Sequence, residues 1–542
     1  MKKISRKQFL QLAGISAAAL SLTACGGSSA STAASGSAAA SATASDGPAD
    51  KTVTIATVTM WDTMNPIDHT QTDTDWILEN IYDRLILING DGTWSPRLAE
   101  SWEYNDEQTV FTLHIDPKAA WHDGEPVTAN DVAYTFRLCS SAEKAWLRQS
   151  INCKYYLGTD ENGCEESEDS IQVVATDDST VEFRLKEPAD PISFFCRSLK
   201  DVFILPEHIL GQHSDAEVAD LDFWDAPIGS GPFKYVSQVD GESIEMTANE
   251  NYHLGCPKFK TLVYKKMDQA AIAAALLSGD VDMTMSLSAM DIDTVQTSSD
   301  IVVESAPNYS YQSMVCNVYD PLLTRDVRVA IDKAIDKQAI VDQIYFGYAE
   351  ALVSTFPSNA PYYDSNLPAT TYDPDGAKQL LESAGWDSGN VLEMQVASGS
   401  DSNMTKALMI QQDLEKVGVK TEIVTYDFAT VLSNMRALQF QLLFMGSAAA
   451  IEPSASTSGI LFFTQSDDEH LNDLIKQGTQ SVVFEERKKI YDEIQEYCLD
   501  QGYLSNLYSP YYVVVYNSRL SNIPVKTTDI YNGRQIWTWD VA

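Results

Sequence analysis

Residues 26–45 contain only glycine, serine, alanine and threonine. A segment of this composition has no large apolar side chain to bury, so it cannot recover the entropy that ordering its backbone would cost. We therefore expect residues 25–50 to form a flexible tether, whose ends lie on the order of 25 to 30 Å apart. The fold must be built from residues 51–542, a length that favours more than one hydrophobic core.

The segment before the tether has the features of an export signal. An apolar stretch over residues 9–24 is too short and too weakly apolar to cross a bilayer core of roughly 30 Å as a permanent helix. Residues 5–10 resemble a twin-arginine motif with lysine in the second basic position, which leaves the export route open. We predict that residues 1–24 are a signal peptide. Its positive charges come from four residues: Lys2, Lys3, Arg6 and Lys7.

The end of this signal, Leu22-Thr23-Ala24-Cys25-Gly26, resembles the bacterial lipobox, in which a small residue precedes a cysteine that is acylated before cleavage. The resemblance implies that Cys25 is the lipidated mature amino terminus. Two or more acyl chains suffice for stable anchoring, where one is marginal. We therefore expect a lipid anchor on the extracytoplasmic face of the cell membrane. The alternative is an ordinary secretory signal with a chance cysteine.

The chain is strongly acidic, with a formal net charge of −40 at pH 7. This charge argues against nucleic-acid binding, which depends on clustered lysine and arginine. Attraction of cationic ligands and solubility of an exported protein both fit such a surface. The scattering of acidic residues along the chain favours solubility.

Cysteine and histidine spacing predicts no metal site and no cofactor. None of the cysteines forms a CxxC pair, and none of the 7 histidines has a familiar chelating spacing. An exported location permits disulfides. Cys153 and Cys164 form the pair that we expect to bond, because Gly158 and Asn162-Gly163 lie between them as turn signals. The alternative is that these cysteines are buried thiols.

Local patterns after the tether alternate between strands and helices, which indicates an α/β class. Residues 110–115 alternate as a half-buried strand. Asp373-Pro374 predicts a helix start, and Gly385 predicts the end of that helix. Residues 404–417 predict a helix that ends at Gly418.

Ordered motifs resemble the extracellular solute-binding protein family 5, the peptide and nickel binding components of ABC importers. The strongest motif is Trp121-His122-Asp123-Gly124-Glu125-Pro126-Val127-Thr128, which continues to Phe136. Most of these motif residues are expected to be structural, with Trp102, Trp121 and Phe136 in the core. The other matching segments are 64–66, 82–86, 96–103, 111–115, 228–234, 249–252, 278–282, 326–330 and 384–386.

The resemblance implies a two-lobed α/β fold of the type II periplasmic-binding-protein kind, with an extra domain inserted in the first lobe. Hinge closure of the two lobes would bury a ligand between them. The implied first lobe consists of residues 51–92, 226–310 and 512–542, the inserted domain of residues 93–225, and the second lobe of residues 311–511.

The resemblance also implies where a ligand would lie. The first-lobe wall should include Thr70, Gln71 and Thr72, and the second-lobe wall Gly446, Ser447 and Glu452. Peptide-binding relatives usually carry an aspartate at the position of Ala450, where it pairs with the amino terminus of the peptide. Because an unpaired buried ammonium is costly, either Glu452 supplies the anchor or the ligand lacks an amine there. Glu452 could equally be a surface or capping residue.

The sequence favours a binding protein over an enzyme. It contains no Gly-x-Ser-x-Gly elbow, no His-Glu-x-x-His helix and no Walker A loop. We predict a monomeric substrate-binding component that delivers oligopeptides or related small ligands to membrane permease subunits. The alternatives are a non-peptide ligand, such as a modified peptide, opine, sugar or nickel chelate, and a role in sensing rather than import.

Overall fold

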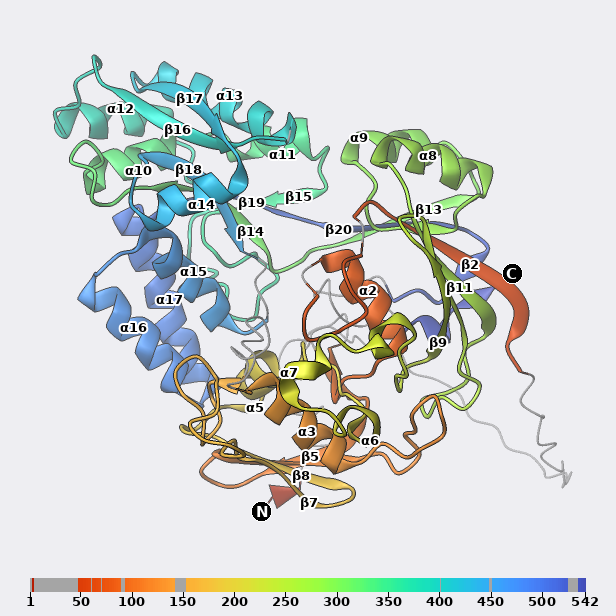
Figure 1. The fold of residues 1–542 in the computed structure, drawn as a ribbon. Coiled ribbons are helices and arrows are strands. Elements are labelled where there is room, and N and C mark those ends of the chain that lie inside the picture. Colours follow the sequence, from red (N-terminus) through yellow and green to blue (C-terminus); the bar gives the residue numbers. More distant parts are fainter. Residues whose placement is uncertain are drawn as a thin grey trace, which may run out of the picture.

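The computed structural model describes residues 2–3, 47–59, 61–69, 71–88, 93–141, 153–399, 401–447, 451–524 and 535–542. Three large sheets organise the chain into two lobes (Figure 1). We use "first lobe" for the unit around the seven-stranded sheet and "inserted domain" for the unit around the five-stranded sheet. The unit around the six-stranded sheet is called the second lobe.

The first lobe is a mixed sheet in the order β13-β20-β12-β2-β11-β10-β9. The central strand β2 runs parallel to both β11 and β12, and the strands toward either edge are antiparallel. The strands are β2 (Ala49–Thr57), β9 (Phe233–Val239), β10 (Ser243–Ala248), β11 (Phe259–Lys266), β12 (Met283–Thr284), β13 (Ile301–Ala306) and β20 (Tyr512–Asn517). The helices are α2 (Thr72–Ile81), α8 (Gln269–Ser278) and α9 (Ala289–Val295). Small elements complete it: β3 (Ile86–Ile88) with β4 (Trp94–Pro96), β21 (Leu520–Ser521) with β22 (Asp540–Val541), and η3 (Ile536–Thr538).

The inserted domain is an antiparallel sheet in the order β1-β5-β6-β8-β7. The predicted strand is confirmed as β6 (Val110–Ile115), and Phe111, Leu113 and Ile115 are buried in the core. Helix α3 (Ala129–Cys139) begins with a capping box between Thr128 and Asp131. The other strands are β5 (Ala99–Tyr104), β7 (Val173–Asp177) and β8 (Thr180–Arg184), and β1 (Lys2–Lys3), which falls within the predicted signal peptide, pairs with β5. The remaining helical turns are α5 (Pro191–Phe194), the π-helix η1 (Phe195–Leu199), α6 (Glu207–Leu210), α7 (Asp215–Val218) and η2 (Asp222–Asp225).

The second lobe has a sheet in the order β15-β19-β14-β18-β16-β17, with helices around it (Figure 1). The predicted cap is confirmed, since the Asp373 carboxylate accepts a hydrogen bond from the Gly376 N–H. Gly385 and Gly418 both adopt positive φ after their helices, as the C′ position requires. The strands are β14 (Tyr311–Cys316), β15 (Ala349–Ala351), β16 (Val391–Ala397), β17 (Lys420–Tyr426), β18 (Leu442–Ser447) and β19 (Leu504–Pro510). The helices are α10 (Arg325–Ala334), α11 (Lys337–Ile344), α12 (Pro374–Ser383), α13 (Asp401–Lys416), α14 (Phe428–Arg436), α15 (Pro453–Thr464), α16 (Glu469–Gln480) and α17 (Phe484–Gln501).

The lobes have separate cores and two chain crossings. One continuous apolar cluster joins the first lobe to the inserted domain, whereas the clusters of the second lobe draw their buried residues from 311–508 alone. The crossings run from β13 to β14 and from β19 to β20, and these strands pair side by side within each lobe. Two separately packed bodies joined by adjacent strands can move as rigid units about a hinge.

The expected disulfide is not present. The structure has both Cys153 and Cys164 as thiols, which was the alternative. Cys153 is buried, with its Sγ 3.8 Å from the Phe136 carbonyl oxygen, whereas Cys164 lies in a partly exposed turn. Two turn signals between cysteines predict that the chain reverses, but they do not fix where each thiol points.

Within the residues that the structure describes, no helix combines the length and the apolar character that crossing a bilayer requires.

Candidate functional site

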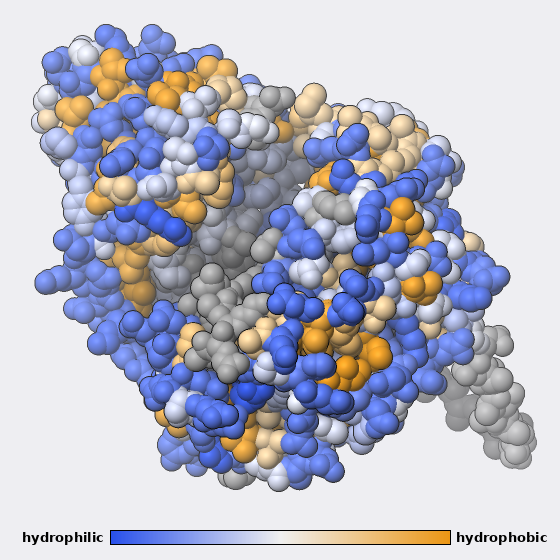
Figure 2. Space-filling model, viewed as in Figure 1, coloured by the Kyte–Doolittle hydropathy of each residue, from blue (hydrophilic) through white to orange (hydrophobic). Residues whose placement is uncertain are grey.

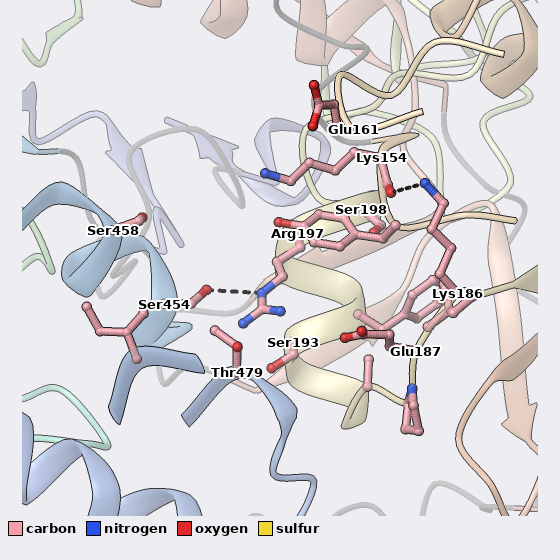
Figure 3. Close-up of a pocket in the computed structure, with 16 residues that line it drawn as sticks. Lys154, Glu161, Lys186, Glu187, Ser193, Arg197, Ser198, Ser454, Ser458 and Thr479 are labelled. Atoms are coloured by element: carbon pink, nitrogen blue, oxygen red, sulfur yellow. Dashed lines mark hydrogen bonds between the residues drawn. The ribbon is translucent and has the colours of Figure 1, made fainter. Parts of the chain in front are cut away.

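A cavity of about 440 Å³ lies between the inserted domain and the second lobe (Figure 3). The surface is also hollowed between the two lobes in the space-filling view (Figure 2). From the inserted domain the cavity is lined by Lys154, Tyr155, Glu161, residues 185–189, Ser193, Phe194, Arg197 and Ser198. From the second lobe it is lined by Ser454, Ser458, Ile475 and Thr479.

Charged groups and hydroxyls converge on this cavity from both sides. The Lys186 ammonium donates to the carbonyl oxygens of Lys154 at 2.9 Å and Asp160 at 3.2 Å, which fixes the loop that carries Lys154. Among the described residues, no carboxylate lies within ion-pair distance of the Lys154 ammonium. The centroid of the Tyr155 ring lies 5.1 Å from the ammonium nitrogen. Lys154 is therefore a cation of this wall that a ligand carboxylate could meet, beside Lys186, whose ammonium is already bonded to two carbonyl oxygens.

A second space of about 840 Å³ lies between α8–α9 of the first lobe and the second lobe near α11 and α13. The described residues that line it, such as Met290, Tyr345 and Met404, carry no formal charge. A small zwitterionic ligand is held by a few placed polar and charged groups in a largely apolar pocket. The smaller, charged cavity fits that requirement better.

Glu452 lies beside the smaller cavity and is buried, with 1% of its surface exposed. Its carboxylate caps α15 by accepting from the Ser454 N–H at 2.9 Å, and Glu452 is buried rather than a surface residue. It also accepts from Arg487 at 2.5 Å and Arg197 at 3.1 Å. A ligand ammonium would have to displace an arginine to reach this carboxylate.

The two arginines set the charge of Glu452. Burial alone would raise the pKa of its carboxyl, but the guanidinium groups of Arg197 and Arg487 bring that pKa below its ordinary value. Burial would lower the pKa of Arg487, yet the carboxylates of Asp190 and Glu452 raise it above its ordinary value. Glu452 and Arg487 are therefore both charged at neutral pH.

The predicted first-lobe wall lies at the start of α2. Gln71 immediately precedes the helix and is half-buried, while Thr70 and the side chain of Thr72 lie outside the described residues. The next residue, Asp73, accepts a hydrogen bond from the Thr59 N–H at 2.9 Å, which ties the helix start to the end of β2. None of the described residues of this wall lines the 440 Å³ cavity.

Gly446 and Ser447 end β18 close to a chain crossing. The register pairs Gly446 with Gln312 and Ser447 with Tyr311, the first residues of β14 after the crossing. These two residues do not line the 440 Å³ cavity either. The proposed lipid site, Cys25, lies outside the described residues.

The family-like segments 82–86 and 96–103 place charged residues where the first lobe and the inserted domain meet. Asp83 and Arg97 form a buried ion pair, and the Tyr252 hydroxyl donates to Asp83 at 3.2 Å. Arg84 donates to the Asp75 carboxylate at 3.1 Å and so holds α2. These motif residues therefore position α2 rather than face a cavity.

Three of the charged residues around Glu452 were not predicted from the sequence: Asp190, Arg197 and Arg487. Asp190-Pro191 carries the same helix-start signal as Asp373-Pro374, and Asp190 does cap α5. Nothing local in the sequence indicates that this capping carboxylate also meets Arg487. In the described part of the chain, no cluster of three or more metal-ligating side chains is found.

Comparison with known proteins places the chain in one family. Residues 93–469 match the family described as "Bacterial extracellular solute-binding proteins, family 5 Middle". A Brucella ovis protein, described as a candidate ABC transporter peptide-binding protein, is 30% identical over 395 residues, covering 70% of this chain and 69% of that protein. The dipeptide-binding protein of Escherichia coli is 28% identical over 387 residues, covering 68% and 70%.

Solved structures agree on the fold. The ABC transporter substrate binding protein CtaP of Listeria monocytogenes superposes with a TM-score of 0.78 at 24% identity, covering 91% of this chain and 99% of that chain. The oligopeptide-binding protein AppA of Bacillus subtilis, in complex with a nonapeptide, has a TM-score of 0.73 at 23% identity, covering 92% and 100%. With a family match over more than half of its length, the chain belongs to the bacterial extracellular solute-binding proteins of family 5.

Proposed function

We propose that this protein captures short peptides outside the cytoplasmic membrane and delivers them to the permease of an ABC importer. The observation that carries the proposal is the cavity between the inserted domain and the second lobe, in a chain of the solute-binding family. Its volume of about 440 Å³ suits a ligand of a few residues. The names of relatives that bind dipeptides and peptides support the same ligand class.

Binding would follow from closure of the two lobes. A peptide in the cleft offers backbone groups that can pair with strand edges whatever its side chains are. Thr70, Gln71, Thr72, Gly446 and Ser447 are proposed contacts along the interlobe cleft beyond the 440 Å³ cavity, since Gln71, Gly446 and Ser447 do not line that cavity. Lys154 would face the carboxylate end of the ligand. Ligand binding then shifts the equilibrium from the open to the closed form, and the permease would recognise the closed form.

The other parts of the proposal come from the sequence. Cys25 would carry the lipid anchor, residues 25–50 the tether, and the protein would act as a monomer on the extracytoplasmic face. The lobes would divide at 92/93, 225/226, 310/311 and 511/512. The first of these boundaries falls between the paired strands β3 and β4, so the inserted domain would leave the first lobe through a hairpin. Catalysis and a bound cofactor form no part of this proposal.

The test is thermal unfolding of protein that has been denatured, dialysed and refolded to remove bound ligand. Peptide pools of two to six residues should raise the unfolding midpoint, whereas the same amino acids supplied free should not. A ligand at a hundred times its Kd stabilises by about 2.7 kcal/mol, which corresponds to roughly 3 °C for a chain of this length. A shift with sugars or nickel chelates and none with peptides would contradict the proposal.

Lys154→Met then locates the ligand. We expect the variant to bind peptides about tenfold more weakly, because the ligand carboxylate loses a charge-assisted hydrogen bond. Lys118→Met is the matched control, since Lys118 is exposed in the same domain and does not line the cavity. Equal affinities for the two variants would exclude Lys154 from the site.

A further inference from the structure

Four charged side chains form an alternating chain across the two lobes: Asp190, Arg487, Glu452 and Arg197. Arg487 Nη1 donates to Asp190 Oδ2 at 2.5 Å, and Arg487 Nη2 donates to Glu452 Oε1 at 2.5 Å. Arg197 Nη2 donates to the same Glu452 oxygen at 3.1 Å. The charges of these four side chains therefore alternate in sign and sum to zero.

Neutral partners complete this network. The Ser193 hydroxyl donates to Asp190 at 2.5 Å and has Glu452 Oε1 at 3.1 Å. Arg197 Nε donates to the Ser454 hydroxyl at 3.0 Å, a contact that crosses the edge of the cavity (Figure 3). Arg487 donates to the Gly478 carbonyl oxygen at 3.0 Å.

The central pair is withdrawn from water. The side chains of Arg487 and Glu452 are 1% and 2% exposed, whereas those of Asp190 and Arg197 are 13% and 16% exposed. Breaking a buried ion pair by removing one partner is strongly destabilising, because a charge is left uncompensated. The outer pair can return to water at less cost than the central pair.

The chain of charges divides at the lobe boundary. Asp190 and Arg197 stand on the inserted domain, and Glu452 and Arg487 stand on the second lobe, whose only covalent links to the rest are the crossings near 306–311 and 510–512. If the lobes part, the Asp190–Arg487 and Arg197–Glu452 pairs break, but Arg487 and Glu452 remain together. Ile451, next to Glu452, also packs against the core of the first lobe and inserted domain.

We propose that these four residues are an interlobe latch, which stabilises the closed form by itself and leaves each lobe close to neutral when it opens. The second lobe keeps the neutral Arg487–Glu452 pair, and the inserted domain keeps one residue of each sign. The latch therefore sets the closed population before any ligand binds. This inference does not depend on the ligand being a peptide.

The test uses variants that keep the local folds intact. Asp190→Asn removes the charge that Arg487 meets but retains the cap of α5, because asparagine caps helices as well as aspartate does. Arg197→Met removes both contacts to the second lobe and keeps an apolar stem at the half-buried position. The matched controls are Asp427→Asn, at the cap of α14, and Arg184→Met, whose partner Glu182 lies on its own strand.

The measurement is the radius of gyration by small-angle scattering on refolded, ligand-free protein. Each cross-lobe charged contact corresponds to roughly a tenfold change in the ratio of closed to open forms. The double variant Asp190→Asn/Arg197→Met should therefore have a larger radius of gyration than the wild type. The double control should match the wild type. Faster hydrogen exchange in residues 191–199 of the double latch variant should accompany the change.

A radius of gyration and an exchange rate equal to those of the wild type would overturn the latch. If the double variant fails to fold, Asp190→Asn alone carries the test, and an unchanged radius of gyration there has the same meaning. Failure of peptides to bind would refute the proposed function without affecting these ligand-free measurements. The two proposals are therefore tested separately.

Discussion

His122 should make the fold lose stability in mildly acid solution. Its Nδ1 accepts a hydrogen bond from the Gly229 N–H at 3.2 Å, so Nε2 must carry the proton that faces the Gly231 carbonyl oxygen at 3.0 Å. A second proton on Nδ1 would break the Gly229 bond. Burial chiefly, and the Lys234 ammonium as a further contribution, lower the pKa of His122 to about 4, although the Gly231 carbonyl opposes them.

The sign and size of this change in the free energy of unfolding follow from proton linkage. Between its unfolded pKa of about 6.5 and its folded pKa of about 4, the unfolded chain binds a proton that the folded chain does not. Stability is therefore full above pH 6.5 and falls as the pH drops toward 4. Integrating between pH 7.5 and 4.5 gives a loss of about 2.5 kcal/mol, as an upper limit for a ring that is partly accessible.

The assay compares wild type with His122→Gln, which supplies a neutral donor and acceptor. Urea titrations at several pH values give the free energy of unfolding of each protein, and their difference removes the contribution of the carboxylates. We expect the free energy of unfolding of the wild type to fall by about 2 kcal/mol more than that of His122→Gln as the pH falls from 7.5 to 4.5. Parallel curves would refute the assignment of the neutral tautomer.

Three further changes test other parts of the structure. Lys406 is 2% exposed with no described carboxylate within ion-pair distance, and burial lowers the pKa of its ammonium to about 8, so Lys406→Met should stabilise the protein by about 1 to 3 kcal/mol at pH 7. That gain should shrink as the pH rises from 8 to 10.5, where the folded lysine is already neutral; a loss of stability at pH 7 would contradict it. Gly231→Ala should cost about 1 to 3 kcal/mol, because its Cβ would lie 2.5 Å from the Asn80 carbonyl oxygen, while Gly47→Ala meets nothing within 4 Å and serves as the control. Cys25→Ser should abolish incorporation of labelled palmitate and release the protein from membranes; retention of label would place the lipid elsewhere.

Local signals predicted local structure well. The alternation of residues 110–115 predicted β6 and its buried face. The Asp-Pro and glycine signals predicted the start of α12 and the ends of α12 and α13. These features depend on residues within one turn or strand of each other, so the sequence contains the whole signal. Strong family-like segments extended the prediction to the two lobes.

Contacts between segments that lie far apart in the sequence could not be predicted from local patterns. Glu452 meets Arg197, which is 255 positions away, and Arg487 meets Asp190, 297 positions away. No periodicity links such positions, so a carboxylate in a loop could be assigned to a ligand as easily as to an arginine. Lys406 similarly lies in a predicted helix, but the buried side of that helix depends on how it packs on β16 and β17.

The proposed function requires that a peptide occupies the space between the lobes. The most direct measurement is mass spectrometry of the small molecules released when the purified protein is denatured, with the amount quantified against the protein. We expect peptides of a few residues, approaching one equivalent per chain and reduced in Lys154→Met. One equivalent of a molecule without peptide bonds would contradict it.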